Sequence, residues 1–397
     1  MTNNNDKKVL NVPPSTDKGN AIRNVPPLRF PEFSGEWKEE QLDSIATLSK
    51  GVGISKEQLS EVGEPCILYG ELYTKYKSEI IKQIESKTDI DCSKLKRSKA
   101  NDVIIPCSGE TAVDIATARC VPFDNILFGG DLNVISLHKY DGAFMSYQLN
   151  GKRKYDIARV AQGVSVVHLY GDHLKAIKTY NPTLPEQQKI AKLLSLLDER
   201  IATQNKIIED LNKLKSAISE CIFNSIKGDV VMLSEICDIV KGKQINGEYL
   251  SESGEYYVMN GGTEPSGYYS EYNVKANTIS ISEGGNSCGY VQFNNFPFWS
   301  GGHCYSLQNI ADIVDNLYLY HYLKSKEEAI MKLRIGSGLP NIQKKDLAMF
   351  KTIVPPFEQQ ITISTFLSSL ERKAEIEERI LNVMQKQKLY LLQQMFI

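Results

Sequence analysis

The sequence has few of the features that mark membrane, secreted and metal-bound proteins. No apolar run in the 397 residues reaches the length of a membrane span, and residues 1–20 lack the apolar core of a signal peptide. The eight cysteines form no CxxC pair, which favours reduced thiols over a disulfide framework or a zinc cage. We therefore expect a cytoplasmic protein of ordinary globular composition.

Motifs of catalysis are missing as well. The chain has no GxxxxGK[ST] loop for ATP, and the nearest stretches to a methyltransferase tetrapeptide, NPTL (181–184) and VPPF (354–357), are incomplete. His303 and Cys304 are adjacent in an expected strand and so point to opposite faces, which disfavours shared metal ligation. The ERK stretch (371–373) resembles part of a nuclease motif but lies in a helical repeat and is better explained as helix surface. The sequence predicts no catalytic residue and no metal site.

Positive charge is not in excess. The formal net charge is -2 at pH 7, whereas a nucleic-acid binder usually presents a basic surface. Binding to nucleic acid would therefore require local basic patches or basic partners.

What the chain does contain is an internal repeat. A shift of 173 positions places Ile190 on Ile363 and Asp198 on Glu371, while the Glu-Gln-Gln triplets match at 172, which predicts one inserted residue just after them. The same shift pairs Gly163 with Gly336. Further matches join His168 to Asn341, residues 41–51 to 232–242 at a shift of 191, and residues 101–111 to 276–286. A duplication of this kind indicates two copies of one structural unit.

The domain organisation follows from the repeat. Short β-branched and aromatic runs bounded by Gly, Asn and Asp predict two strand-rich domains, each with a helix of its own. We expect a mobile tail over 1–27, domains over 28–180 and 227–352, and long helices over 181–226 and 353–397.

Both long helices carry a heptad pattern. Eight of ten a and d positions are apolar in each, which predicts a two-helix seam, and about 39 residues make a rod of ~58 Å. The fold class is therefore α+β, with two strand-rich domains at opposite ends of a long antiparallel two-helix coiled coil and a pseudo-two-fold repeat. The predicted seam residues are Leu194, Leu197, Ile201, Gln204, Ile208, Leu211, Lys215, Leu370, Glu377, Leu381, Met384, Lys388 and Leu391.

Polar residues in the seam predict its register. If facing residue numbers sum to 592, Lys215 lies opposite Glu377, and Gln204 lies opposite Lys388. The alternative is that these residues face solvent at a loose seam.

Several motifs resemble a known family. LRFPEFSGEW (28–37), the helix openings PEQQ and PFEQQ, and GSGLPNI (336–342) resemble the specificity subunit of type I restriction–modification systems, from about residue 28 to the end. The resemblance implies two target-recognition domains, a bipartite asymmetric duplex DNA target and no catalysis by this chain. The first domain departs from the pattern at Val164, Val167 and His168.

The resemblance also implies partners. Two methyltransferase subunits and restriction (translocase-nuclease) subunits would join the chain and would bring S-adenosylmethionine, ATP and Mg, none of which this chain would bind. On DNA the complex would lie with the nucleoid. Two alternatives stay open: a coiled-coil protein–protein adaptor with two binding heads and no DNA contact, and a specificity chain that serves a single restriction-methylase polypeptide.

Loop composition suggests DNA contacts, because polar side chains read bases while Lys and Arg hold phosphates. In the first domain the predicted residues are Tyr69, Glu71, Tyr73, Tyr76, Ser108, Glu110 and Thr111, with Lys94, Lys96, Arg97 and Lys99 for phosphates. In the second they are Asn260, Gly261, Gly262, Thr263, Glu283 and Asn286, with Lys241 and Lys243 for phosphates. Solvated loops and ordinary turn chemistry explain the same residues equally well.

Overall fold

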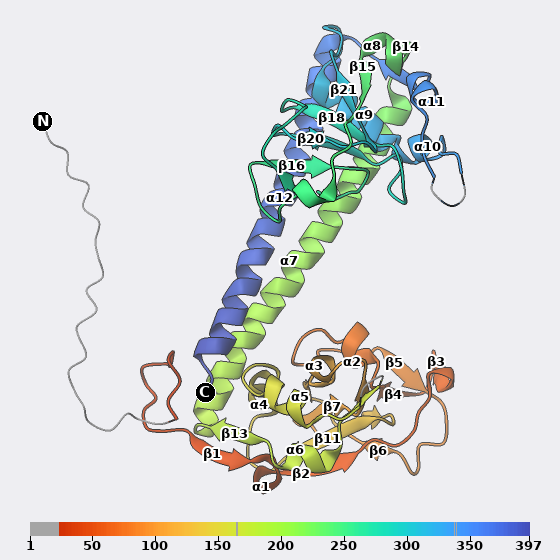
Figure 1. The fold of residues 1–397 in the computed structure, drawn as a ribbon. Coiled ribbons are helices and arrows are strands. Elements are labelled where there is room, and N and C mark those ends of the chain that lie inside the picture. The colour runs from red at the N-terminus through yellow and green to blue at the C-terminus, as the bar shows by residue number, and fades with distance from the viewer. Residues whose placement is uncertain (1–23, 164–165, 337, 339) are drawn as a thin grey trace, which may run out of the picture. The chain divides into compact units, whose positions relative to one another are not determined.

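The chain divides into two compact units. The computed structural model describes residues 24–163, 166–336, 338 and 340–397. Unit 1 comprises residues 1–202 and 382–397, and unit 2 comprises residues 203–381 (Figure 1). The borders of the units therefore fall inside the two long helices rather than at the ends of the strand-rich domains. The predicted tail over 1–27 lies largely outside the described residues.

Unit 1 contains a strand-rich domain with short helices. Its strands are β1 (Lys38–Gln41), β2 (Ala46–Lys50), β3 (Leu59–Ser60), β4 (Glu64–Ile67), β5 (Ser86–Thr88), β6 (Lys96–Arg97), β7 (Asp102–Pro106), β8 (Ser108–Gly109), β9 (Arg119–Val121), β10 (Leu127–Phe128), β11 (Leu132–Leu137), β12 (Val167–His168) and β13 (Lys178–Asn181). Its short helices are α1 (Leu42–Ile45), α2 (Glu71–Thr74), α3 (Ala112–Ile115), α4 (Gly142–Asn150), α5 (Lys154–Val160) and α6 (Gly171–Lys175), with a 3₁₀ turn at Lys56–Gln58.

Unit 2 repeats this plan with fewer residues. Its strands are β14 (Asp229–Met232), β15 (Asp238–Lys241), β16 (Tyr256–Met259), β17 (Tyr268–Tyr269), β18 (Thr278–Ser282), β19 (Val291–Asn294), β20 (Trp299–Ser300), β21 (Cys304–Gln308) and β22 (Lys351–Val354). Its short helices are α8 (Leu233–Ile236), α9 (Asn316–Ser325), α10 (Glu327–Met331) and α11 (Lys344–Ala348), with a 3₁₀ turn at Gly247–Tyr249.

The same four-stranded sheet occurs in both units. Its order is β2-β11-β7-β9 in unit 1 and β15-β21-β18-β19 in unit 2. The central strands β7 and β18 are buried along their whole length, as their apolar runs predict. Before them, Asn101 and Asn277 both adopt a positive φ (81° and 57°), so this strand repeats at a shift of 176. The sequence match of 101–111 with 276–286 was therefore one residue out of register.

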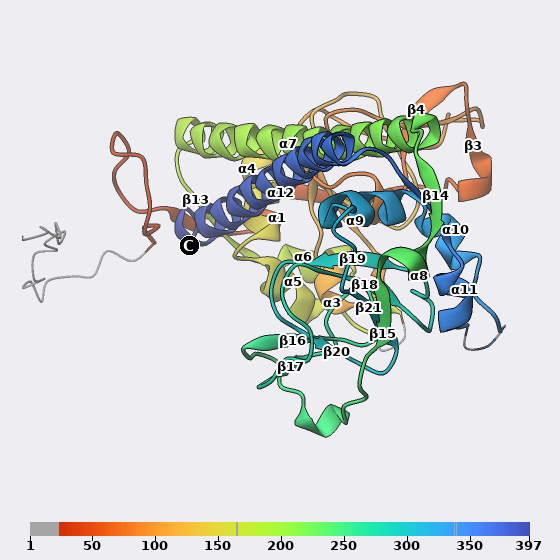
Figure 2. The same ribbon diagram turned by 90° about the horizontal axis from the view of Figure 1, so that it is seen from above.

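A second sheet accompanies the first in each unit. In unit 1 it has the order β3-β5-β4-β10-β6, and in unit 2 the order β17-β16-β20. The core of unit 2 lies where α9 packs on β18 and β19 (Figure 2). In unit 1, α4 packs in the same way on β7 and β9.

A glycine repeated at a shift of 191 lies where two backbone segments approach each other closely. A Cβ on Gly51 would lie 2.0 Å from the carbonyl oxygen of Gly129, and a Cβ on Gly242 would lie 2.2 Å from that of Gly301. No side chain fits either position. The sequence match of 41–51 with 232–242 thus preserves a close approach of two backbone segments.

The two long helices lie within the predicted spans 181–226 and 353–397 and are a few residues shorter. Helix α7 spans Leu184–Ser225 (42 residues) and α12 spans Phe357–Gln394 (38 residues). All the predicted seam residues are buried or half-buried. Within unit 1 the start of α7 packs on the end of α12, with Leu194 and Leu391 in one apolar cluster, and within unit 2 the end of α7 packs on the start of α12, with Ile222 and Ile363 in another. Both packed segments are antiparallel.

The predicted seam register is wrong. Gln204 donates to Glu377 Oε2 at 2.7 Å, and Lys215 pairs with Glu371 at 3.5 Å, six residues from its predicted partner. In unit 1, Lys388 pairs with Asp198 at 2.6 Å. The lysines thus bond acids that flank the apolar seam positions, because a long Lys side chain reaches past the seam.

The Glu-Gln-Gln motif fastens each domain to its helix. Gln187 accepts from the Asp141 N–H at 2.9 Å, and Gln360 accepts from the Asp315 N–H at 2.8 Å. Both aspartates are N-caps, of α4 and α9 respectively. Gln187 and Gln360 stand 173 positions apart, and β13 and β22 before them keep the same shift. The predicted inserted residue is therefore wrong, because the structure keeps one shift on both sides of the motif.

Glu186 is the anchor of the LRFPEFSGEW segment in unit 1. Its buried carboxylate accepts two hydrogen bonds from Arg29, each 2.7 Å long, and a third from Trp37 Nε1 at 3.3 Å. Trp37 packs edge-on against Phe144 and Phe396. Two separate sequence motifs therefore form one structural contact.

Candidate nucleic-acid interface

Both units place the same pair of loops at one end of the central strand. In unit 1, the Gln162 and His168 backbones bond each other, and His168 pairs with Ser108 just after β7. In unit 2, Ile335 and Asn341 bond each other, and Asn341 pairs with Gly284 just after β18. The loop after the central strand is thus held by a second loop from far along the chain.

Glycine closes the second loop in each unit. Gly163 and Gly336 both have a positive φ, at 125° and 98°. A Cβ on Gly163 would meet the carbonyl oxygen of Val166 at 2.1 Å. The repeated glycine is therefore a turn requirement. Val164, one of the positions where the family pattern breaks, lies outside the described residues.

Glu283 is the centre of the loop cluster in unit 2. Its carboxylate lies 2.6 Å from Lys241 Nζ and accepts from the Tyr305 hydroxyl at 3.2 Å. Its Oε2 is buried and has no hydrogen-bond partner among the described residues, and His303 Nδ1 lies 3.7 Å away. Burial, followed by Glu283, raises the pKa of Tyr305 above its ordinary value. Glu283 therefore links the end of β15 to the start of β21.

Asn260 and the neighbouring glycines join this cluster. The Asn260 side chain accepts from the His303 N–H at 3.2 Å, and the Gly261 carbonyl accepts from Ser282 at 2.7 Å. Gly262 is half-exposed, while Thr263, Asn286 and Lys243 are exposed. All the predicted DNA-contact residues of the second domain lie in these loops and the adjoining end of β15.

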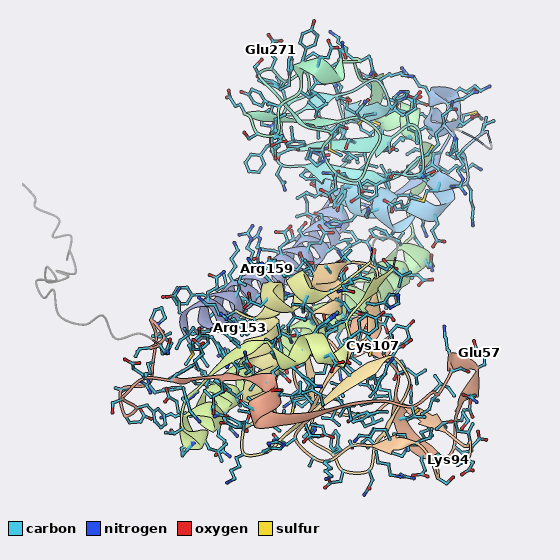
Figure 3. All side chains as sticks on the ribbon, turned by 60° about the horizontal axis from the view of Figure 1, so that its bottom comes forward. Glu57, Lys94, Cys107, Arg153, Arg159 and Glu271 are labelled. Carbon is cyan, nitrogen blue, oxygen red and sulfur yellow. The ribbon has the colours of Figure 1, made fainter. Side chains whose placement is uncertain are left out.

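The predicted contact residues of unit 1 separate into two groups. Tyr73 donates to the Ser108 carbonyl at 3.0 Å, and Thr111 caps α3 by accepting from the Asp114 N–H. Tyr69, Glu110 and Thr111 are exposed near them. The basic run lies elsewhere in unit 1, on and around β6, with Lys94 at the outer surface and Cys107 inside (Figure 3).

Three further predicted contacts of unit 1 are buried or paired within the chain. Glu71 is buried, accepts from the Leu68 N–H at 2.9 Å and pairs with Lys75. Tyr76 is buried in the core. Arg97 makes a bidentate pair with Glu64, which raises the pKa of Arg97. Among the described residues, Lys94, Lys96 and Lys99 have no ion-pair partner. Lys94 and Lys99 are exposed and Lys96 is half-buried, which suits contacts to phosphates.

Sequence reasoning missed His303 and Asn341 as members of the loop cluster. His303 was considered only as a metal ligand with Cys304; its side chain is 61% exposed, whereas Cys304 is buried. Asn341 carried a signal, because the repeat pairs it with His168. In the described part of the chain, no group of three or more His, Cys, Asp or Glu side chains is placed to hold a metal ion.

A polar cavity of about 650 Å³ lies in unit 2 between the α7–α12 seam and α9. His321 lines it and its Nε2 lies 2.9 Å from Ser368 Oγ. Glu371 of the ERK stretch lines it too, next to the seam residue Leu370, and pairs with Lys215. None of the described helices is long and apolar enough to cross a membrane.

His321 predicts an acid sensitivity of unit 2. Burial, followed by Lys215, lowers the pKa of His321 from 6.5 to about 4. The unfolded chain therefore binds more protons than the native chain between these values, and stability falls as pH drops from 6.5 towards 4, by up to about 3 kcal/mol. Urea unfolding followed through Trp299, in a Trp37→Phe background, measures this loss. His321→Gln should flatten the pH dependence; an unchanged slope in that variant would assign the loss to other groups.

Comparison with known proteins accounts for this architecture. The family model described as "Type I restriction modification DNA specificity domain" matches residues 34–213 and again residues 227–386. A chain from Methanocaldococcus jannaschii named as a type I restriction enzyme MjaX specificity subunit is 23% identical over 88% of this chain and 90% of its own length.

A type I specificity subunit from Mycoplasma pneumoniae is 33% identical over 39% of this chain. The matched part spans 41% of that relative's length. The crystal structure of the S subunit of a type I restriction–modification system from M. genitalium has the same fold, with a TM-score of 0.69 and 20% identity over 94% of this chain and 99% of its own. Since the family model matches both halves, the chain belongs to the family of type I restriction–modification DNA specificity subunits, with one specificity domain in each half.

Proposed function

We propose that this chain reads a bipartite, asymmetric duplex DNA target, one short half-site per unit. The observation that carries this proposal is the duplicated loop pair. Both units hold the loop after the central strand against a second loop through the same backbone pairing, yet the side chains differ: His168 and Ser108 in unit 1, Asn341 and Gly284 in unit 2. Equal scaffolds with different side chains suit two different base sequences.

The chain acts without catalysis of its own. It positions two adenine methyltransferase subunits and restriction (translocase-nuclease) subunits, and those partners supply S-adenosylmethionine, ATP and Mg. Exposed apolar residues on the long helices support docking of partner subunits: Leu196 (47% exposed), Leu214 (51%) and Val383 (65%). The complex would act in the cytoplasm, on the nucleoid.

Salt dependence tests this proposal against a protein–protein adaptor. The chain with its methyltransferase should retard a duplex bearing the target, and the affinity should fall at least a hundredfold between 50 and 200 mM salt because phosphate contacts release counterions. Lys94→Ala with Lys99→Ala should reduce the salt slope, since both side chains are exposed. Retardation that is absent, or equal at both salt concentrations, would favour the adaptor.

A further inference from the structure

The edge of the four-stranded sheet is covered in unit 1. The Cys120 N–H of edge strand β9 donates to the Glu79 carbonyl at 2.8 Å, and the Ile81 N–H donates to the Cys120 carbonyl at 3.0 Å. Ile80 forms a parallel bridge to Cys120. The segment 79–81 therefore continues the sheet by one short strand.

The side chain of Glu79, in this added segment, completes an ion cluster on the two long helices. Glu79 Oε2 lies 2.6 Å from Lys388 Nζ, whose other partner, Asp198, is also 2.6 Å away. Burial alone would lower the pKa of Lys388, but Glu79 and Asp198 together raise it. Ser78, just before the segment, donates to Asp198 as well.

In the part of the chain that the structure describes, unit 2 contains the same edge without a covering segment. Phe293 of edge strand β19 pairs with Ile279 of β18. Cys120 of β9 pairs with Val103 of β7 at the same place in the sheet of unit 1. The alternation of the antiparallel ladder turns the N–H and C=O of Phe293 away from β18. Among the described residues nothing bonds these two groups. An unpaired edge is a template for another strand.

In both units, side chains bond the backbone of the edge strand at the same position, two residues before the residue whose backbone is covered in unit 1 and, among the described residues, unpaired in unit 2. In unit 1 the Asn150 amide bonds the N–H and C=O of Ala118, two residues before Cys120. In unit 2, Glu327 and Lys324 bond the N–H and C=O of Val291, two residues before Phe293. In each unit, side chains of that unit therefore bond the edge strand at Ala118 or Val291. The residue two positions later, Cys120 or Phe293, is the next one whose backbone faces outward.

Within the described ranges, the ion cluster of unit 2 has no third member. Lys215, which corresponds to Lys388, has Glu371 at 3.5 Å and is half-exposed in the polar cavity. Lys324 and Glu327, which also line this cavity, are bonded to each other. The connection from β16 to β18, residues 260–277, is shorter than residues 68–101 from β4 to β7, the stretch that holds Glu79.

We propose that an extended acidic segment of the methyltransferase partner pairs with β19 at Phe293 and places an aspartate or glutamate carboxylate on Lys215. This inference rests on the proposed function for the identity of the partner. The charge of Lys215 selects an acid, and the exposed backbone of Phe293 selects an extended strand, as in other cases of strand addition to a sheet edge. The partner segment would cover the edge strand and supply a carboxylate in unit 2, as residues 78–81 of this chain do in unit 1.

Hydrogen exchange on the full chain, alone and with its methyltransferase, tests this pairing. On complex formation the Phe293 amide should exchange at least tenfold more slowly, whereas the Val291 amide, already bonded to Glu327, should change little. If Phe293 is equally protected in the chain alone, a segment of this chain covers the edge and the proposal is wrong. If a complex that methylates its target leaves Phe293 unchanged, the proposal fails and the proposed function stands.

Replacement of the lysine provides the second measurement. Lys215→Met should weaken binding of the methyltransferase at least tenfold, whereas Lys213→Met on the same helix should not, because Lys213 is 70% exposed and pairs with Glu209. Equal affinities of the two variants would overturn the proposal. Loss of both complex and methylation in the unaltered chain would instead defeat the proposed function, and this inference with it.

Discussion

Lys388→Met should destabilise unit 1 by about 3–5 kcal/mol, because it leaves two buried carboxylates facing each other without a cation. The side chains of Glu79 and Asp198 are only 9% and 7% exposed, and both lie 2.6 Å from the lysine. Urea unfolding followed through Trp37 measures the loss. Trp299→Phe removes the only other tryptophan, so that the signal comes from unit 1.

Lys215→Met is the matched control for this effect. The corresponding pair in unit 2, Lys215 and Glu371, is 3.5 Å apart, with side chains 34% and 26% exposed. A pair this open contributes under about 1 kcal/mol. Similar losses in the two variants would contradict the account of a completed cluster in unit 1 and an incomplete one in unit 2.

Asn286→Ala should relax specificity at one base pair of one half-site. Asn286 is exposed in the loop after β18, where Gly285 has a φ of 78° and the Gly285 N–H bonds the Pro340 carbonyl at 3.0 Å. Loss of a side-chain contact to a base costs about 1–3 kcal/mol, which is roughly a 5- to 150-fold loss of discrimination. Methylation rates on duplexes with single-base changes measure it.

Glu110→Ala is the reciprocal variant in unit 1. Glu110 is exposed in the corresponding loop after β7 and should affect only the other half-site. Two variants that alter the same half-site, or both half-sites together, would contradict the assignment of one half-site to each unit.

The sequence predicted the features that periodicity records. Heptads gave both long helices, and the repeat gave two copies of one domain, because buried faces must recur with the period of the helix or the duplication. The seam register was not predictable in this way. Its lysines bond Asp198 and Glu371, which flank the seam positions, and no pattern of a and d residues identifies them.

The candidate site was predicted at the level of loops rather than side chains. Asn260, Glu283 and Lys241 do lie together, since Gly-rich loops at strand ends meet on one edge of a sheet. Glu71 and Tyr76 look the same in the sequence as exposed loop residues, yet tertiary packing buries both. Glu79 gave no signal at all, because its partner Lys388 lies 309 positions away.

Methylome sequencing tests the central claim most directly. Cells that carry this chain with its neighbouring methyltransferase should gain N6-methyladenine at one new motif, made of two short defined halves around a fixed gap, that is absent without the chain. Exchange of residues 259–269 should then alter only one half. An expressed methyltransferase that adds no motif, or a motif with a single continuous half, would contradict a two-unit reader of DNA.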